Sequence, residues 1–169
     1  QVDSTTTINS SQLNADALLG KDLRLSHDAS TPQILIYHTH SQEGYADSVP
    51  GDASTSVVGV GDYLTKLLED KGYNVYHDKS VYDLKNGQLD RSKAYNYALD
   101  GITNILQQNP SIEVVLDIHR DAIEREDGTR IAPVAEIGGQ KAAQIMIICG
   151  ADNGRMNMPN YKQNLRFAS

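Results

Sequence analysis

Two short stretches of this chain end an apolar run in histidine. The first reads ILIYHTHSQE and contains His38, His40 and Glu43, and the second reads VVLDIHRD and contains His119. Imidazole nitrogens and carboxylate oxygens are ordinary zinc ligands, and catalytic zinc sites commonly use three protein ligands plus a water. Such a site makes water nucleophilic near neutral pH and polarises a carbonyl. The two stretches together predict a zinc hydrolase.

The residues alone leave open which histidine of the first stretch binds the metal. His38 and His40 are two apart, so on a continuing strand they would point to the same face. If the strand ends at Tyr37, His40 is better placed to turn into a cleft. Glu43 and His119 complete the predicted site. The competing interpretation is that these histidines and the glutamate are ordinary polar residues at strand ends.

The two residues after His119 are candidates for supporting roles. Asp121 is predicted to orient a ligand histidine through its free ring nitrogen. Arg120 is predicted to bind a substrate carboxylate or to stabilise a developing oxyanion. The alternative for both is that they pair with each other or with solvent.

Other polar residues give weaker signals. Asp117, inside the second apolar run, is predicted to be structural, and His27 and His77 are predicted to lie on the surface. Glu136 is a further candidate base, although a lone glutamate is usually solvated. Cys149 lies in an apolar run and is predicted to pack in the core rather than react. The chain has no Gly-x-Ser-x-Gly elbow and no phosphate loop.

The elements that must position these residues alternate between strand and helix. Apolar patterns predict strands over 33–37, 74–77, 113–118 and 144–149, and helices over 57–68 and from a cap at Asp90 to 108, with shorter helical segments at 15–19 and from Tyr161. This order predicts an α/β fold with a mostly parallel twisted sheet flanked by helices. Residues 1–30 are predicted to be a linker or tail, and residues 31–169 one domain.

Composition narrows the classes of protein. The chain has 169 residues and a formal charge of −7, which argues against nucleic-acid binding. No apolar run approaches the length of a membrane span. Because the chain begins at Gln1, we expect an upstream signal or anchor. The single cysteine leaves the compartment open.

Four motifs carry a family resemblance: Tyr37–Tyr45, Gly72–Val75, Asp90–Tyr95 and Asp117–Ala122. In these the chain, from about residue 33 onwards, resembles the stage II sporulation protein P family of cell-wall hydrolases in endospore-forming bacteria. That family is related to the zinc-dependent N-acetylmuramoyl-L-alanine amidases. The resemblance implies an amidase fold, cleavage of the bond between the glycan's lactyl group and the stem peptide, and in some members cleavage of peptide cross-links.

The resemblance also implies a ligand set and a setting. By analogy with the amidases, zinc is expected on His40, Glu43 and His119, with His38 as the alternative ligand. Family members lie outside the cytoplasm, anchored by an upstream membrane segment, and act on peptidoglycan with a partner lytic transglycosylase during engulfment. The catalytic acid/base glutamate is expected beyond Ser169, so the chain is predicted to be an incomplete domain that binds zinc but hydrolyses weakly or not at all.

Two other classes of function compete with this interpretation. The first is a non-catalytic module of the same fold that binds the cell wall or docks a partner. The second is a metal hydrolase acting on another substrate, such as a deacetylase or a metallopeptidase. The products formed from purified cell walls discriminate among the three.

Overall fold

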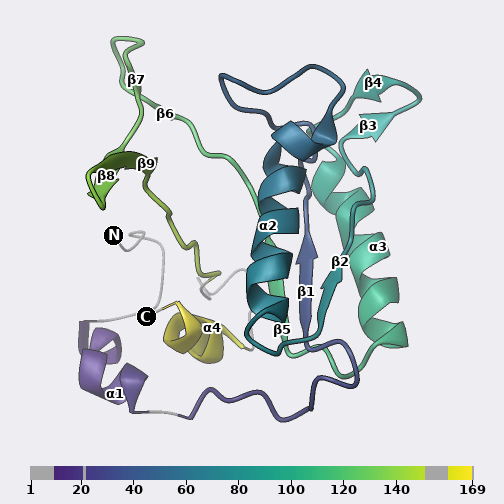
Figure 1. Cartoon of the computed structure of the whole chain (residues 1–169), viewed down its shortest axis with the longest axis vertical. Coiled ribbons are helices and arrows are strands. Elements are labelled where there is room, and N and C mark those ends of the chain that lie inside the picture. The colour runs from purple at the N-terminus through teal and green to yellow at the C-terminus, as the bar shows by residue number, and fades with distance from the viewer. Residues whose placement is uncertain (1–9, 21, 151–159, 169) are drawn as a thin grey trace. The chain divides into compact units, whose positions relative to one another are not determined.

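The computed structural model describes residues 10–20, 22–150 and 160–168. The chain divides into two compact units, and each is described here by itself (Figure 1). One unit comprises Leu25–Ile123, and the other comprises Gln1–Arg24 together with Glu124–Ser169. The division that the sequence predicted, a tail to residue 30 and one domain after it, stays a prediction.

A three-stranded parallel sheet forms the centre of the Leu25–Ile123 unit. Its strands are β1 (Ile34–Tyr37), β2 (Val75–His77) and β5 (Val114–Asp117), in the order β2-β1-β5. β1 is the middle strand, and the first three of its four residues are buried. Its unbroken apolar run is what a strand covered on both faces requires. Three of the four predicted strands are therefore confirmed.

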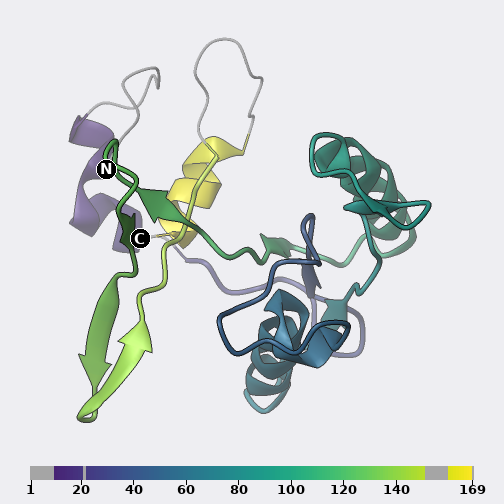
Figure 2. The same cartoon turned by 90° about the horizontal axis from the view of Figure 1, so that it is seen from above.

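Two helices cover this sheet, one on each face (Figure 2). α2 (Val57–Glu69) begins where the Ser56 side chain accepts a hydrogen bond from the Val58 amide, and the turn that follows it contains Gly72 at φ 91°. Ser at this position satisfies an amide that the helix itself leaves unpaired, and glycine adopts positive φ at little cost.

The second helix, α3 (Ala94–Gln108), buries Ala94, Ala98 and Ile102. These residues are four apart and form one stripe of the helix. The predicted cap at Asp90 is wrong: the helix begins after Lys93, without a side-chain cap, and the Asp90 carboxylate instead accepts a hydrogen bond from the Ser92 hydroxyl. A local side-chain bond of this kind competes with capping.

The topology of the sheet decides where chemistry can occur. β1 and β5 are neighbours but are not consecutive in the chain, and their register pairs Tyr37 with Asp117. Parallel strands bring their carboxyl ends to one edge, and open α/β sheets bind ligands where neighbouring strands are not consecutive in this way. The segments that follow β1 and β5 therefore meet at this edge.

Shorter elements complete the unit. They are η2 (Ala53–Thr55) and the hairpin of β3 (Leu84–Lys85) with β4 (Gln88–Leu89). β6 (Ile123–Glu124) spans the boundary between the two units and pairs with β7 (Arg130–Ile131).

The other unit contains small elements. These are η1 (Ser10–Leu13), α1 (Ala15–Leu19), the hairpin of β8 (Val134–Ile137) with β9 (Gln140–Ala143), and α4 (Tyr161–Phe167), which contacts α1. The helical segments predicted at 15–19 and from Tyr161 are thus present. None of the helices in the described ranges combines the length and the apolar character needed to cross a bilayer.

One predicted strand of this unit is wrong. Residues 144–150 have no regular structure, Ile145 is 92 % exposed and Ile148 is 80 % exposed. Cys149 is only partly buried, so the prediction that it packs in the core is also wrong. An apolar run shows that a segment can be buried, but it becomes a strand only where another strand pairs with it.

Candidate metal centre

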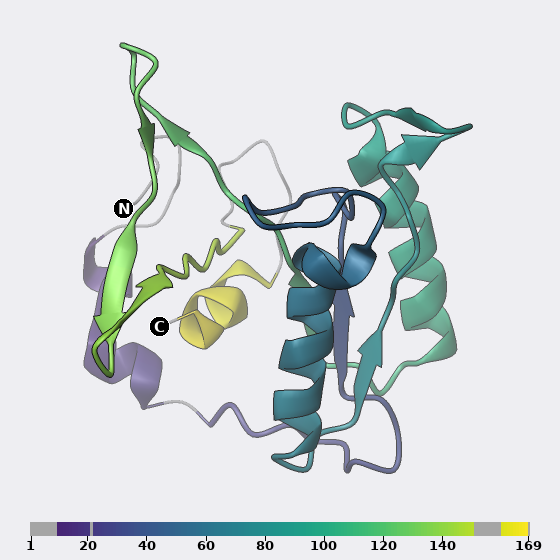
Figure 3. The ribbon, with the colours of Figure 1, turned by 45° about the horizontal axis from the view of Figure 1, so that its top comes forward.

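The loop after β1 turns sharply, and this turn places His40 and Glu43 together. The Glu43 amide donates to the His40 carbonyl at 3.1 Å, and the Glu43 carbonyl accepts from the amide of Val57, the first residue of α2, at 3.0 Å. In Figure 3 this loop rises over the amino end of α2. The turn directs the chain from the sheet edge to the helix with both side chains buried, His40 7 % and Glu43 5 % exposed.

A second carboxylate, that of Asp83, fixes the loop through hydrogen bonds. Asp83 is completely buried and accepts hydrogen bonds from the Ser41 hydroxyl at 2.9 Å and from the Gln42 amide at 3.1 Å. Both donors lie between His40 and Glu43. Because a buried carboxylate is stable only when its oxygens are paired, these bonds favour this one conformation of the loop.

β5 ends at Asp117, and His119 lies two residues beyond it. Nε2 of His119 lies 2.8 Å from Asp117, and its Nδ1 lies 3.7 Å from Glu43. The hydrogen bond to Asp117 raises the pKa of His119, against the opposing effect of burial. Asp117 also accepts from the Thr39 amide at 2.9 Å and the Thr39 hydroxyl at 2.6 Å, so it ties the end of β5 to the loop after β1.

Both oxygens of Glu43 are occupied by donors. One accepts from the Arg91 guanidinium at 2.5 Å, and the other accepts from the Arg120 amide at 2.6 Å. The Arg91 side chain remains 46 % exposed. The charge of the buried Glu43 carboxylate is therefore balanced by Arg91, whose side chain extends to the solvent.

His40 is the one member of this group with an unsatisfied atom. Its Nδ1 is buried and has no hydrogen-bond partner among the described residues. Its ring centroid lies 5.3 Å from that of His119 and 5.2 Å from that of Tyr95. Burial, with the nearby charge of Arg91, lowers the pKa of His40, which favours the neutral form that metals bind.

His38, the alternative ligand, has both ring nitrogens in use. It is completely buried; its Nδ1 donates to the Ile118 carbonyl at 3.2 Å and its Nε2 lies 2.9 Å from Nε2 of His77. His77 in turn contacts Asp62 through Nδ1 at 3.0 Å, and its side chain is 6 % exposed. The prediction that His77 lies on the surface is therefore wrong. These contacts favour His40 over His38 as the candidate ligand.

The supporting residues occupy other places than the sequence suggested. Arg120 contributes its backbone amide to Glu43. The Asp121 carboxylate accepts from the amide of Ala122, and the carboxylate that contacts His119 is Asp117. Glu136 is an exposed residue of β8 in the other unit.

Three residues of the site carry weak signals in the sequence: Asp117, Arg91 and Tyr95. Asp117 lies two positions before His119, which was a usable signal, because alternate strand residues share a face. Arg91 precedes α3 and Tyr95 lies in its first turn, far from both histidine stretches in the chain. In the sequence, only their position in the Asp90–Tyr95 motif marks them. Tyr95 stacks on His119 with 6.2 Å between ring centroids.

The donor set fits zinc in kind. A neutral histidine with an unpartnered nitrogen, a second histidine and a buried carboxylate converge, and these are zinc ligands. In the part of the chain that the structure describes, however, no group of three or more His, Cys, Asp or Glu residues is arranged as a metal site. Binding therefore requires the three side chains to draw closer, with Glu43 sharing an oxygen that Arg91 or Arg120 now holds.

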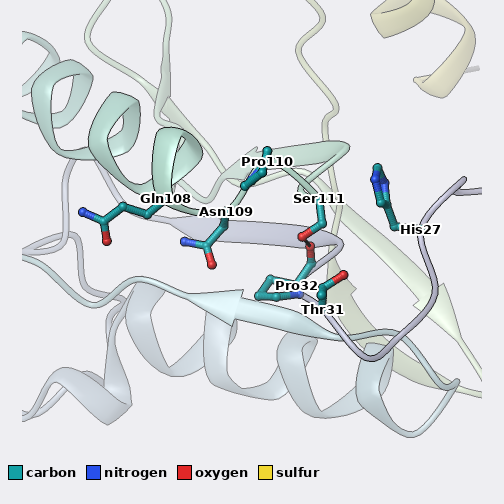
Figure 4. A pocket seen from close by; sticks show the side chains of 7 residues that line it. All are labelled: His27, Thr31, Pro32, Gln108, Asn109, Pro110 and Ser111. Carbon is teal, nitrogen blue, oxygen red and sulfur yellow. Dashed lines mark hydrogen bonds between the residues drawn. The ribbon is translucent and has the colours of Figure 1, made fainter.

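One hollow of this unit lies beside the cluster, and another lies away from it. One of about 460 Å³ includes Tyr45, two residues beyond Glu43. Another, of about 330 Å³, lies at the opposite end of the sheet and includes His27, Pro32 and Ser111 (Figure 4).

Comparisons with known proteins agree with the motifs. A model of the stage II sporulation protein P family matches residues 1–169. The stage II sporulation protein P of Bacillus subtilis (strain 168) is 25 % identical over 146 residues, which cover 80 % of this chain and 34 % of that protein. The chain thus spans about a third of the length of this relative. No solved structure matches the chain. Since the family match extends over all of its residues, the chain belongs to the stage II sporulation protein P family.

Proposed function

We propose that this chain forms part of a zinc-dependent peptidoglycan amidase, an enzyme with an amidase-like fold that cleaves the amide between the glycan's lactyl group and the stem peptide during sporulation. His40, Glu43 and His119 are the proposed ligands. The observation that carries the proposal is the buried, unpartnered Nδ1 of His40 beside a second histidine and a buried carboxylate. An unsatisfied buried polar atom costs about 1–3 kcal/mol, so its persistence calls for a ligand.

Zinc in this position would act as a Lewis acid and make water nucleophilic near neutral pH. The chain's own groups prepare the site for it. Asp117 accepts a hydrogen bond from Nε2 of His119, so that in the form that binds metal the lone pair of Nδ1 would lie on the side of Glu43. Such outer carboxylates fix both the tautomer and the direction of a ligand histidine.

Arg91 and the Arg120 amide have a second role in this proposal. They hold the Glu43 carboxylate in one orientation, because both donate hydrogen bonds to it. In this proposal the exposed part of the Arg91 guanidinium would also donate to the scissile carbonyl oxygen as negative charge develops there. Preorganised donors of this kind stabilise the transition state more than the substrate.

The setting is part of the proposal. We place the enzyme outside the cytoplasm, attached to the membrane through a segment that precedes these residues in the whole protein. Peptidoglycan is its substrate, and a lytic transglycosylase of the engulfment machinery is its partner. Family membership supports these statements, and the acidic charge of the chain agrees with a partner other than nucleic acid.

The test is product analysis on purified peptidoglycan. The zinc-loaded chain, the chelator-treated chain and Glu43→Gln are incubated with walls, and the soluble products are identified by mass spectrometry. The expected products are glycan freed from peptide and peptide with a new amino-terminal alanine, formed only with zinc and the intact Glu43. Binding to walls without release supports the non-catalytic module. Acetate, or free amino acids, in place of these products indicates another class of hydrolase.

A further inference from the structure

A shallow hollow of about 460 Å³ lies between the loop after Glu43 and the first turns of α2. This volume is within the range of small-ligand sites, roughly 300–1,000 Å³. Its lining residues are Tyr45, Asp47, Ser54, Thr55, Ser56, Gly59, Val60 and Tyr63.

The hollow adjoins the loop that carries Glu43. Its wall residue Ser56 is bridged to Gly44, the residue after Glu43, and the next residue, Val57, donates its amide to the Glu43 carbonyl. Tyr45, a lining residue of the hollow, follows Glu43 by two positions in the same loop. The hollow is therefore lined by residues that adjoin Glu43 along the loop and through its backbone partner on α2.

The lining combines aromatic faces with one carboxylate. Tyr45 is 38 %, Val60 43 % and Tyr63 65 % exposed, so apolar surface faces the hollow without a cover in this unit. Asp47 is exposed, and no hydrogen bond or ion pair of its side chain is found among the described residues.

The hydroxyls of the lining are already used by the chain itself. Ser54 donates to Asp52, Thr55 donates to the Asp52 carbonyl, and Ser56 donates to the Ala53 carbonyl. Their protons are thus committed within the chain, and the carboxylate of Asp47 adds an anionic acceptor for a ligand.

We propose that this hollow binds a neutral N-acetylated sugar ring of the substrate, with the ring against Tyr45 and Tyr63 and its hydroxyls donating to Asp47. Aromatic faces with a few fixed polar groups suit an uncharged, flat-sided ligand. A carboxylate-bearing peptide is disfavoured, because Asp47 and the chain's formal charge of −7 repel it. The inference rests on the proposed function, in which the sugar that carries the lactyl group lies next to the scissile amide.

The test measures sugar binding without metal. The whole 169-residue chain, with chelator present, is titrated with N,N′-diacetylchitobiose, a neutral disaccharide, and amide shifts are followed by NMR. We expect saturable shifts at residues 44–63, about fivefold to tenfold weaker binding in Tyr63→Ala and in Asp47→Asn, and wild-type binding in Tyr63→Phe. Tyr63 is largely exposed, so its replacement leaves the fold intact. Tyr73→Ala, which removes a tyrosine 40 % exposed near the other end of α2, is the matched control and is expected to bind normally.

Three results would overturn the proposal: no saturable shifts, unchanged affinity in Tyr63→Ala, or shifts confined to the opposite end of the sheet. Stronger binding of the dipeptide L-alanyl-D-glutamate than of the disaccharide at residues 44–63 would overturn it as well. Because chelator is present, failure here is separate from failure of the amidase proposal, which the products formed from peptidoglycan decide.

Discussion

The two ends of the parallel sheet differ in whether their buried polar side chains have hydrogen-bond partners. At the amino end, Gln33 donates through Nε2 to the His27 carbonyl and accepts through Oε1 from the Asn74 amide. The exposed Glu113 also accepts from the amide and the ring of His27, and the buried Ser111 donates to the Pro32 carbonyl. This end has a hollow of about 330 Å³ (Figure 4), yet its polar groups are satisfied by the chain.

At the carboxyl end, the segments that follow β1 and β5 carry His40, Glu43 and His119, and among the described residues His40 keeps a buried nitrogen without a partner. Buried polar groups are nearly always paired in proteins, so an exception needs an explanation. The contrast indicates that the amino end stabilises the sheet, whereas the carboxyl end is arranged for a ligand. Each end has a hollow nearby, so a hollow does not distinguish the candidate site. The buried Nδ1 of His40 without a partner does.

The largest expected effect is on the carboxyl end itself. His40→Ala and His119→Ala should lower zinc affinity by about a hundredfold or more, since each removes a ligand and outer groups alone account for 10–100-fold. Competition with a chromophoric chelator measures this. Gln33→Ala, at the amino end, is the control: it should lower the unfolding temperature and leave zinc affinity unchanged. Equal zinc affinity in all variants would break the comparison.

The next effect concerns the carboxylate that orients His119. Asp117→Asn should lower zinc affinity by about 10–100-fold, because the hydrogen bond that fixes the His119 tautomer is weakened. Asp121→Asn should leave it unchanged, since that carboxylate does not contact the histidine. The same competition assay compares the two variants, and a larger loss in Asp121→Asn would contradict the geometry.

His38 separates stability from metal binding within one end of the sheet. His38→Ala should destabilise the fold by about 2–4 kcal/mol, because it leaves a cavity and removes two buried hydrogen bonds. Zinc affinity of the folded variant should stay within about tenfold of wild type. Chemical denaturation and chelator competition measure the two quantities. Loss of zinc binding without loss of stability would make His38 the ligand.

The smallest effect belongs to the amino end and depends on pH. Amide hydrogen bonds from His27, with help from Ser26, lower the pKa of Glu113 from 4.5 to about 2. The folded-state pKa lies below the unfolded one, so this stabilisation is fully present above about pH 4.5 and is lost as the pH falls towards 2. Glu113→Gln should therefore flatten the decline of the unfolding temperature across that window. Parallel profiles for the two proteins would contradict this.

The sequence predicts the sheet well and the cluster in outline. β1 is a near-continuous apolar run, which packing on both faces requires, and parallel strands bring their carboxyl ends together. From this, His40, Glu43 and His119 could be placed at one edge. The choice between His38 and His40 could not be derived, because it depends on His77 and Ile118, which come from other strands.

The failures share one cause. Residues 144–149 were predicted to be a strand from their apolar character, but pairing is a property of two segments, and one sequence window does not contain the second. Asp90 was predicted to cap α3, but Ser92 offers a nearer partner for its carboxylate. Arg91 and Tyr95 join the cluster through the path of α3, which local patterns do not encode.

The central claim is that zinc binds His40, Glu43 and His119 at the carboxyl end of the sheet. Zinc K-edge absorption on the metal-loaded chain tests it most directly, beside a measurement of bound metal. The account predicts one zinc per chain, with two imidazole nitrogens and carboxylate oxygen at about 2.0–2.2 Å, and loss of one imidazole in His40→Ala. No stoichiometric zinc, or a spectrum unchanged by His40→Ala, would contradict it.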